Sequence, residues 1–314
     1  MSDNGMPFTP DVEQTAIAIA YRNAELIADA VCPRSPVGKR TFEYRVFDKA
    51  ERMTIPDTLV GRKSKVNQVE FTSEPASASC EDHGLSDVVP NEDIKNAPAN
   101  YDPLHHATES VADLMLLARE VRVASLYRNE NNYGYKHTLG TGDLKHLDDP
   151  TLDVLPFLQE LMDDMLSSPN QITIPKKALT KLRSNKHVIK AYNGSLGDSG
   201  LVPLGFIQDT LGIDKVHVGQ AWVNVAKKGE TPKFEAAWGI DQMSFTRVDP
   251  LASTSNNRMT FALTAQYGDR ISSKRDVAAG LDGGIEVLVG EKVRELAIAK
   301  DFGMLLNNLF TPAP

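Results

Sequence analysis

The stretch YDPLHHATESVADLMLLAREVRVASLYR, residues 101–128, predicts the longest helix of the chain. Asp102 is a good N-cap residue, and Pro103 suits the first helical position, where its missing N–H has no partner to lose. Apolar residues then recur at helical spacing on one face, namely Leu104, Ala107, Val111, Leu114, Met115, Ala118, Val121 and Leu126. At 1.5 Å per residue, residues 103–128 would span about 39 Å, so we expect a structural spine.

Two extended stretches precede this helix, at residues 41–48 and 68–79. In the first, Phe42, Tyr44 and Val46 alternate with polar residues, which is the period of a strand with one covered face. Together with the turn-rich residues between them, the two stretches predict a long two-stranded ribbon. Because an isolated ribbon is marginal in water, we expect it to lean on other structure, for which another subunit is a candidate.

A further helix is predicted near the N-terminus, over residues 11–30. Thr9 can cap it and Pro10 suits its first position, while Pro33 and Pro36 stop it. The residues before it contain glycine and proline, so this part of the chain is expected to form an arm.

Downstream of the long helix, helices and short strands are mixed, which predicts an α+β fold. We expect helices at 152–166 and 176–184, strands at 171–175, 215–226 and 258–269, a strand beginning at 285, and a closing apolar run at 304–310. Within 215–226 the apolar alternation slips by one residue at Gly219 and Gln220, which predicts a β-bulge. Trp222 and Trp238 lie in or beside apolar strands, so we expect both rings in the core.

Charge is distributed in two neighbouring blocks of opposite sign. Residues 39–66 hold eight basic and four acidic residues, a balance of +4, whereas residues 67–109 hold nine acids and one base, a balance of −8. One interpretation is two solvated faces. The other is a head-to-tail contact in which the basic block of one copy meets the acidic block of the next.

Composition and motifs exclude several classes of protein. The net charge of −8 argues against a surface that grips nucleic acid. No stretch is long and apolar enough to span a membrane, and no secretory signal is recognisable, so we expect a protein made and used inside a cell. Cys32 and Cys80 lack any metal-ligand spacing and are interpreted as free thiols.

Signatures of catalysis are missing from the sequence. It contains no GxSxG, no GxxxxGK[ST], no HExxH and no GxGxxG after a strand. His105 and His106 are adjacent in the first turn of the long helix, about 100° apart around its axis, so we interpret them as solvated residues. We therefore expect no catalytic, cofactor-binding or metal-binding site.

Seven segments, in this order and spacing, resemble the major capsid proteins of tailed bacteriophages, which share the Hong Kong 97 capsid fold. They are residues 94–102 (IKNAPANYD), 107–123 (ATESVADLMLLAREVRV), 181–191 (KLRSNKHVIKA), 218–226 (VGQAWVNVA), 237–239 (AWG), 264–270 (TAQYGDR) and 290–296 (GEKVREL). The resemblance extends over residues 90–310 and implies a structural shell protein that is not an enzyme.

This resemblance also implies a division of the chain. Residues 1–38 would form an N-terminal arm and residues 39–96 an extended loop. Residues 97–168 and 259–314 would form a peripheral domain with the spine helix, and residues 169–258 an axial domain. Such subunits assemble as pentamers and hexamers into an icosahedral shell around double-stranded DNA, which is enclosed but not specifically bound.

Partners follow from the same resemblance. We expect the extended loop to lie over a neighbouring copy, with four bases near four acids of adjoining chains; the candidates are Arg45, Arg52, Arg62 and Lys63, and Glu74, Glu81, Asp82 and Glu92. The arm begins almost at Met1, which implies a separate scaffolding protein alongside a portal and, as a further candidate partner, a decoration protein. No motif supports covalent crosslinking of the subunits. Assembly is expected in the host bacterial cytoplasm, and the virion capsid is the expected final location.

Two rival interpretations stay open. The first is an encapsulin, a cellular compartment of the same fold that encloses cargo enzymes. The second is a small-molecule enzyme with a cleft among the strands of residues 169–280.

Overall fold

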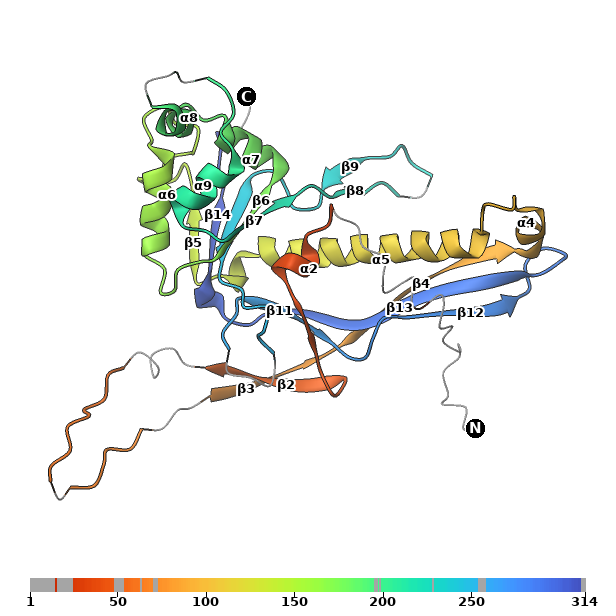
Figure 1. Ribbon diagram of the computed structural model, residues 1–314, viewed down its shortest axis with the longest axis horizontal. Coiled ribbons are helices and arrows are strands. Elements are labelled where there is room, and N and C mark those ends of the chain that lie inside the picture. The colour runs from red at the N-terminus through yellow and green to blue at the C-terminus, as the bar shows by residue number, and fades with distance from the viewer. Residues whose placement is uncertain are drawn as a thin grey trace.

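A computed structural model describes residues 15, 25–47, 54–62, 64–69, 73–194, 197, 199–227, 229–253 and 258–311. Helix α5 (Pro103–Arg128) lies lengthwise across a five-stranded sheet, and a second unit of helices around another five-stranded sheet sits beside one end of it (Figure 1). A two-stranded ribbon continues into a loop that extends away from the body of the molecule.

The predicted spine helix is confirmed with its predicted bounds. Asp102 caps α5, because its carboxylate accepts hydrogen bonds from the N–H groups of Leu104 (2.9 Å) and His105 (3.3 Å). His105 and His106 are exposed, as expected.

The buried face of α5 follows the prediction only in part. Ala107, Val111 and Met115 are buried, but Leu114 and Ala118 are exposed. In the second half, Arg119 and Glu120 turn inward together with apolar neighbours. The predicted stripe was wrong here because buried charged residues occupy positions that hydropathy assigns to solvent.

Strand β13 (Gly284–Ala297) organises the sheet beneath α5. Strand β4 (Glu81–Pro90) pairs along one of its edges, and β12 (Ile271–Val277) and then β11 (Ala262–Gln266) pair in succession along the other. Strand β1 (Arg34–Pro36) adds in parallel to β11. Val289 packs on Val111 and Met115, so α5 packs directly on β13.

The predicted two-stranded ribbon consists of β2 (Thr41–Phe47) and β3 (Ser73–Ser79), which pair antiparallel. Residues 68 and 69, predicted as the start of the second strand, are not in a strand. At its root, Phe42 and Cys80 pack against Leu263 and Ala265 of β11. The ribbon therefore leans on its own chain. The remainder of the predicted loop segment 39–96 has another role, since β4 belongs to the large sheet and the short helix α4 (Asn91–Asn96) follows it.

The second sheet has the order β5-β14-β10-β6-β7. Its strands are β5 (Tyr135–Thr138), β14 (Gly303–Asn307), β10 (Gln242–Thr246), β6 (Gln171–Pro175) and β7 (Lys215–Gly219). Four helices accompany it: α6 (Val154–Asp163), α7 (Lys176–Arg183), α8 (Lys186–Asn193) and α9 (Leu204–Leu211). Single turns of 3-10 helix, η1 (Glu130–Asn132) and η2 (Lys300–Phe302), lead into β5 and β14.

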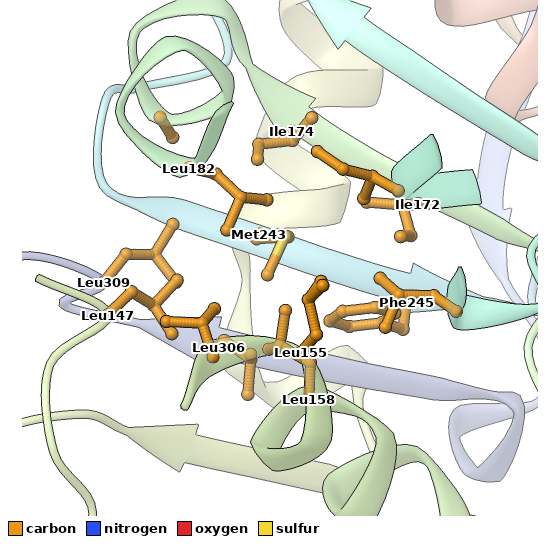
Figure 2. Packing of buried hydrophobic residues seen from close by; sticks show 14 of the residues in the cluster. Leu147, Leu155, Leu158, Ile172, Ile174, Leu182, Met243, Phe245, Leu306 and Leu309 are labelled. Carbon is orange, nitrogen blue, oxygen red and sulfur yellow. The ribbon is translucent and has the colours of Figure 1, made fainter. Parts of the chain in front are cut away.

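One hydrophobic core joins these helices to the sheet. Figure 2 shows Leu155 and Leu158 of α6 meeting Phe245 of β10 and Leu306 of β14. Residues 135–163 and 303–310, which the sequence grouped with the spine helix, thus share a core with residues 171–245. By hydrophobic packing, these two segments therefore belong with the second sheet, whereas the expected domain boundaries place them with the spine helix.

The predicted β-bulge at Gly219 and Gln220 was wrong. The chain leaves the second sheet after Gly219 and starts a separate hairpin of β8 (Trp222–Asn224) and β9 (Phe234–Ala236). A Cβ at Gly219 would lie 2.4 Å from Cγ of Trp238, so the backbone passes this ring only without a side chain. Trp238 is in the core as predicted, but Trp222 is 51% exposed, against the prediction.

Most of the helix predicted over residues 11–30 lies outside the described residues. Its visible end differs from the prediction, because helix α2 spans only Ala28–Val31 and residues 25–27 are not helical. The N–H groups of Ile27 and Ala28 instead bond to a carboxylate from α5. Thr15 lies beside β12, where its Oγ1 donates to the Ser272 carbonyl at 2.9 Å.

Candidate functional site

The described residues of the loop between β2 and β3 are all exposed, and several of them are apolar. Ile55 is 91% exposed and Leu59 84%. Val66 and Val69 are 73% and 55% exposed. Large exposed apolar groups that gather on one projection mark a contact surface. The sequence pattern predicted mainly a turn-rich connection here, because these aliphatic residues are scattered and follow neither strand nor helix spacing.

Of the four predicted basic residues, the two that the structure describes lie in the ribbon and its loop. Arg62 is exposed in the loop between β2 and β3. Arg45 lies in β2 opposite Pro75, and its side chain is outside the described part. Arg52 and Lys63 fall outside the described residues.

The predicted acidic residues lie on or near the large sheet. Glu81 and Asp82 open β4, where Glu81 pairs with Arg294 and Asp82 pairs with Arg40 at 3.0 Å. Glu92 is exposed in α4. Glu74 lies in β3 opposite Val46, and its side chain is likewise undescribed. Among the described side chains, no ion pair joins Arg62 to Glu81, Asp82 or Glu92.

A buried carboxylate that sequence reasoning missed holds the arm to the spine. Glu120 of α5 accepts hydrogen bonds from the N–H groups of Ile27 (3.0 Å) and Ala28 (2.7 Å) and from Trp238 Nε1 (2.6 Å). Burial raises the pKa of Glu120, and the three hydrogen bonds oppose that shift. Glu120 therefore caps α2 from another helix and ties three distant segments together.

Arg119, the next residue of α5, makes a second set of contacts to the same arm. Its guanidinium donates to Asp29 Oδ1 (2.5 Å), to the Cys32 carbonyl (3.1 Å) and to Thr264 Oγ1 (2.9 Å). It is 1% exposed, and burial lowers its pKa. No hydropathy pattern marks this pair, because both residues stand at positions that the predicted apolar stripe leaves to solvent.

A third carboxylate, Glu291 of β13, completes the buried cluster. Arg34 of β1 bonds to it at 2.9 Å, and Arg270 contacts it at 3.2 Å. Burial alone would raise the pKa of Glu291, but the two guanidinium groups outweigh burial and hold the pKa below the usual value of 4.5. Nearby, Arg122 pairs with Glu295 at 3.1 Å. Charges thus join the arm, the helix and the sheet.

The described residues offer little for chemical catalysis. No three His, Cys, Asp or Glu side chains gather there as a metal site. Cys32 and Cys80 are free thiols, as the sequence predicted; both are buried, and burial raises the pKa of Cys32 to about 11. A thiol held neutral in this way is a poor nucleophile. Among the described helices, none is long and apolar enough to cross a bilayer.

Solved structures share this arrangement of elements. The chain aligns with a phage-related protein from Bordetella bronchiseptica RB50 at a TM-score of 0.75 and 19% identity, over 98% of this chain and 99% of that one. It aligns with the capsid of cyanophage P-SCSP1u at a TM-score of 0.59 and 12% identity, over 99% and 93%. The spine helix, projecting ribbon and second unit are those of the Hong Kong 97 capsid fold.

Sequence comparison gives the family. The chain is 47% identical over 305 residues to the major capsid protein of Pseudomonas phage JBD67, which covers 96% of this chain and 97% of the relative. No family model matches the chain. The protein belongs to the major capsid proteins of bacteriophages, and it is a structural component of the virion capsid. The identity favours this assignment over the encapsulin alternative.

Replacing Arg119 with Met should destabilise the subunit by about 1–3 kcal/mol, because the buried Cys32 carbonyl and Thr264 hydroxyl would lose the donor that Arg119 supplies. Urea unfolding of the subunit measures this change. Arg128→Met serves as a control at the exposed end of the same helix, with an expected cost under about 1 kcal/mol. Equal losses in the two variants would contradict the anchoring role of Arg119.

Acid should destabilise the fold through Glu291. Its pKa is lower in the folded chain than the ordinary value of 4.5, so the folded state binds fewer protons than the unfolded state. The stabilisation is therefore complete above that value and is lost as pH falls through the lower, folded pKa. Unfolding free energies measured from pH 7 to pH 3 should fall less steeply for Glu291→Gln. An unchanged slope would show that Glu291 is not one of the responsible groups.

Proposed function

We propose that this protein tiles an icosahedral shell as pentamers and hexamers around packaged double-stranded DNA, and that it acts structurally and not as an enzyme. The observation that carries the proposal is the 47% identity to a phage major capsid protein along nearly the whole chain. The projecting loop with exposed aliphatic side chains supports it, because a single chain leaves that surface uncovered.

The proposal assigns a role to each part of the fold. Residues 1–38 act as an arm and the ribbon with its loop as the extended loop. The large sheet with α5 serves as the peripheral domain, and the second sheet with α6 to α9 as the axial domain. The hydrophobic core favours including residues 135–163 and 303–310 in the axial domain.

Contacts between copies should depend more on apolar side chains than on ion pairs. Burying one Ile, Leu or Val contributes roughly 1.5–3 kcal/mol, whereas an exposed ion pair contributes at most about 1 kcal/mol. Glu81 and Asp82 already have partners within the chain. We therefore propose that Arg45, Arg52, Arg62 and Lys63 orient the loop over acids of the neighbour, including Glu74 and Glu92, while the aliphatic residues hold it.

Other partners belong to the same proposal. A separate scaffolding protein and a portal would take part in assembly in the host bacterial cytoplasm, with a decoration protein as a further candidate. The net charge of −8 suits a lining that encloses DNA without binding it specifically, since strong binding would impede packaging and ejection.

Electron microscopy tests the proposal directly. The protein, produced with the scaffolding protein of its phage and negatively stained, should form rings or closed shells. Uniform particles the size of one 34.4 kDa chain would contradict the proposed function.

Substitutions in the loop test how copies adhere. Leu59→Asp should abolish shells, because it places a charge where an aliphatic side chain is to be buried. Charge reversal by Arg62→Glu with Lys63→Glu should reduce shell yield several-fold. The matched double reversal Lys186→Glu with Lys190→Glu on α8 should leave the yield near that of the parent. Unimpaired assembly of the Arg62 and Lys63 variant would remove these residues from the contact.

A further inference from the structure

One long edge of the large sheet is open along β4. β4 pairs with β13 through residues 81–90, and the N–H of Asn91 donates to the Gly283 carbonyl at 3.0 Å. Hydrogen-bonded residues alternate along an antiparallel pair, so the odd-numbered residues of β4 direct their backbone groups toward β13. The even-numbered residues, from Asp82 to Val88, direct theirs outward.

These outward groups have few partners of their own. Within the described residues, no strand pairs with the outer side of β4, and a side chain reaches only the N–H of Val88, from Asp87 at 2.9 Å. The opposite edge differs, because at β12 the N–H of Ser272 donates to Thr15 Oγ1 at 3.1 Å. An unpaired strand edge is a template for another strand.

Apolar side chains accompany the open edge. Leu85 is 41% exposed and lies opposite Val289, which packs on α5. Val88, on the other face, is 42% exposed. A strand added here would extend a cluster that already exists on the helix side. Exposed acids, Asp87 and Glu92 among them, border the edge.

The loop of the same protein contains a segment that suits this edge. Residues 65–69 are exposed and contain neither proline nor glycine, and no backbone pairing is found for them within the described chain. Val66 and Val69 supply exposed apolar side chains, and Lys65 supplies a positive charge. A second β4 is a poorer occupant, because two acidic rows would face each other.

We infer that residues 65–69 of one copy add as a strand to the β4 edge of a second copy, with Lys65 beside its acids. This inference rests on the proposed shell function and gives the loop contact a defined place and backbone geometry. Backbone hydrogen bonds supply the register, and Val66 and Val69 supply apolar burial.

The first test removes one outward N–H. Ser86→Pro deletes the N–H and places the ring at the edge, while the bonds of Leu85 and Asp87 to β13 remain. Ser86→Ala is the matched control, since it also loses the side-chain bond to Glu286 but keeps the N–H. We expect the assembled fraction to fall at least tenfold for Ser86→Pro and to stay near that of the parent for Ser86→Ala. Equal assembly of the two variants, or equal loss in both, would overturn the inference.

The second test places cysteines in the two segments. A chain with Val66→Cys and Ser86→Cys should form disulfide-linked dimers and longer multimers on a non-reducing gel after mild oxidation. Val66→Cys with Asp209→Cys, on α9, should not. If the circular dichroism of the subunit shows that Ser86→Pro disturbs folding, this crosslinking result decides whether the strand adds at β4.

Both soluble protein and shells are to be oxidised and compared. Absence of shells for the parent chain counts against the proposed function. If neither the soluble protein nor the shells contain linked chains for the Val66 and Ser86 pair, strand addition at β4 is contradicted.

Discussion

The contact between Glu120 and the arm is the constraint on which the rest of the subunit depends. A carboxylate on the spine helix replaces the hydrogen-bond acceptors that the first turn of α2 lacks, and it also holds the indole of Trp238. Arg119 then secures the arm to β11 through Thr264. Removing either group would leave buried donors or acceptors unsatisfied, so these residues fix where the arm crosses the helix.

This crossing point lies between the two units of the molecule. Tyr127 packs edge-on against both Trp238 and Phe261 and donates its hydroxyl to the Val31 carbonyl at 2.6 Å. Gly303, where β14 starts, is so close to Phe261 that a Cβ would lie 2.4 Å from the ring. Arm, spine and both sheets therefore share a single packed junction, and the ribbon emerges from strands that border it.

Sequence patterns were most reliable where local physics decides the structure. The cap at Asp102 and proline at the first position defined α5 to the residue, and β6 matched its predicted range. Errors arose where tertiary contacts decide. The buried pair Arg119 and Glu120 has no hydropathy signal, and the slip at Gly219 has the same pattern whether a strand bulges or ends. The open edge of β4 follows only from strand pairing, which one sequence does not reveal.

The exposed aliphatic side chains of the loop have a consequence for the free subunit. Ile55 and Leu59 face water in the single chain, so unassembled protein should associate increasingly as its concentration rises. Because a closed shell repeats each contact many times, a small change at one residue is multiplied across the particle. The critical concentration for shell nucleation should thus change steeply with single substitutions. The rate of subunit synthesis then sets when that concentration is reached and assembly begins.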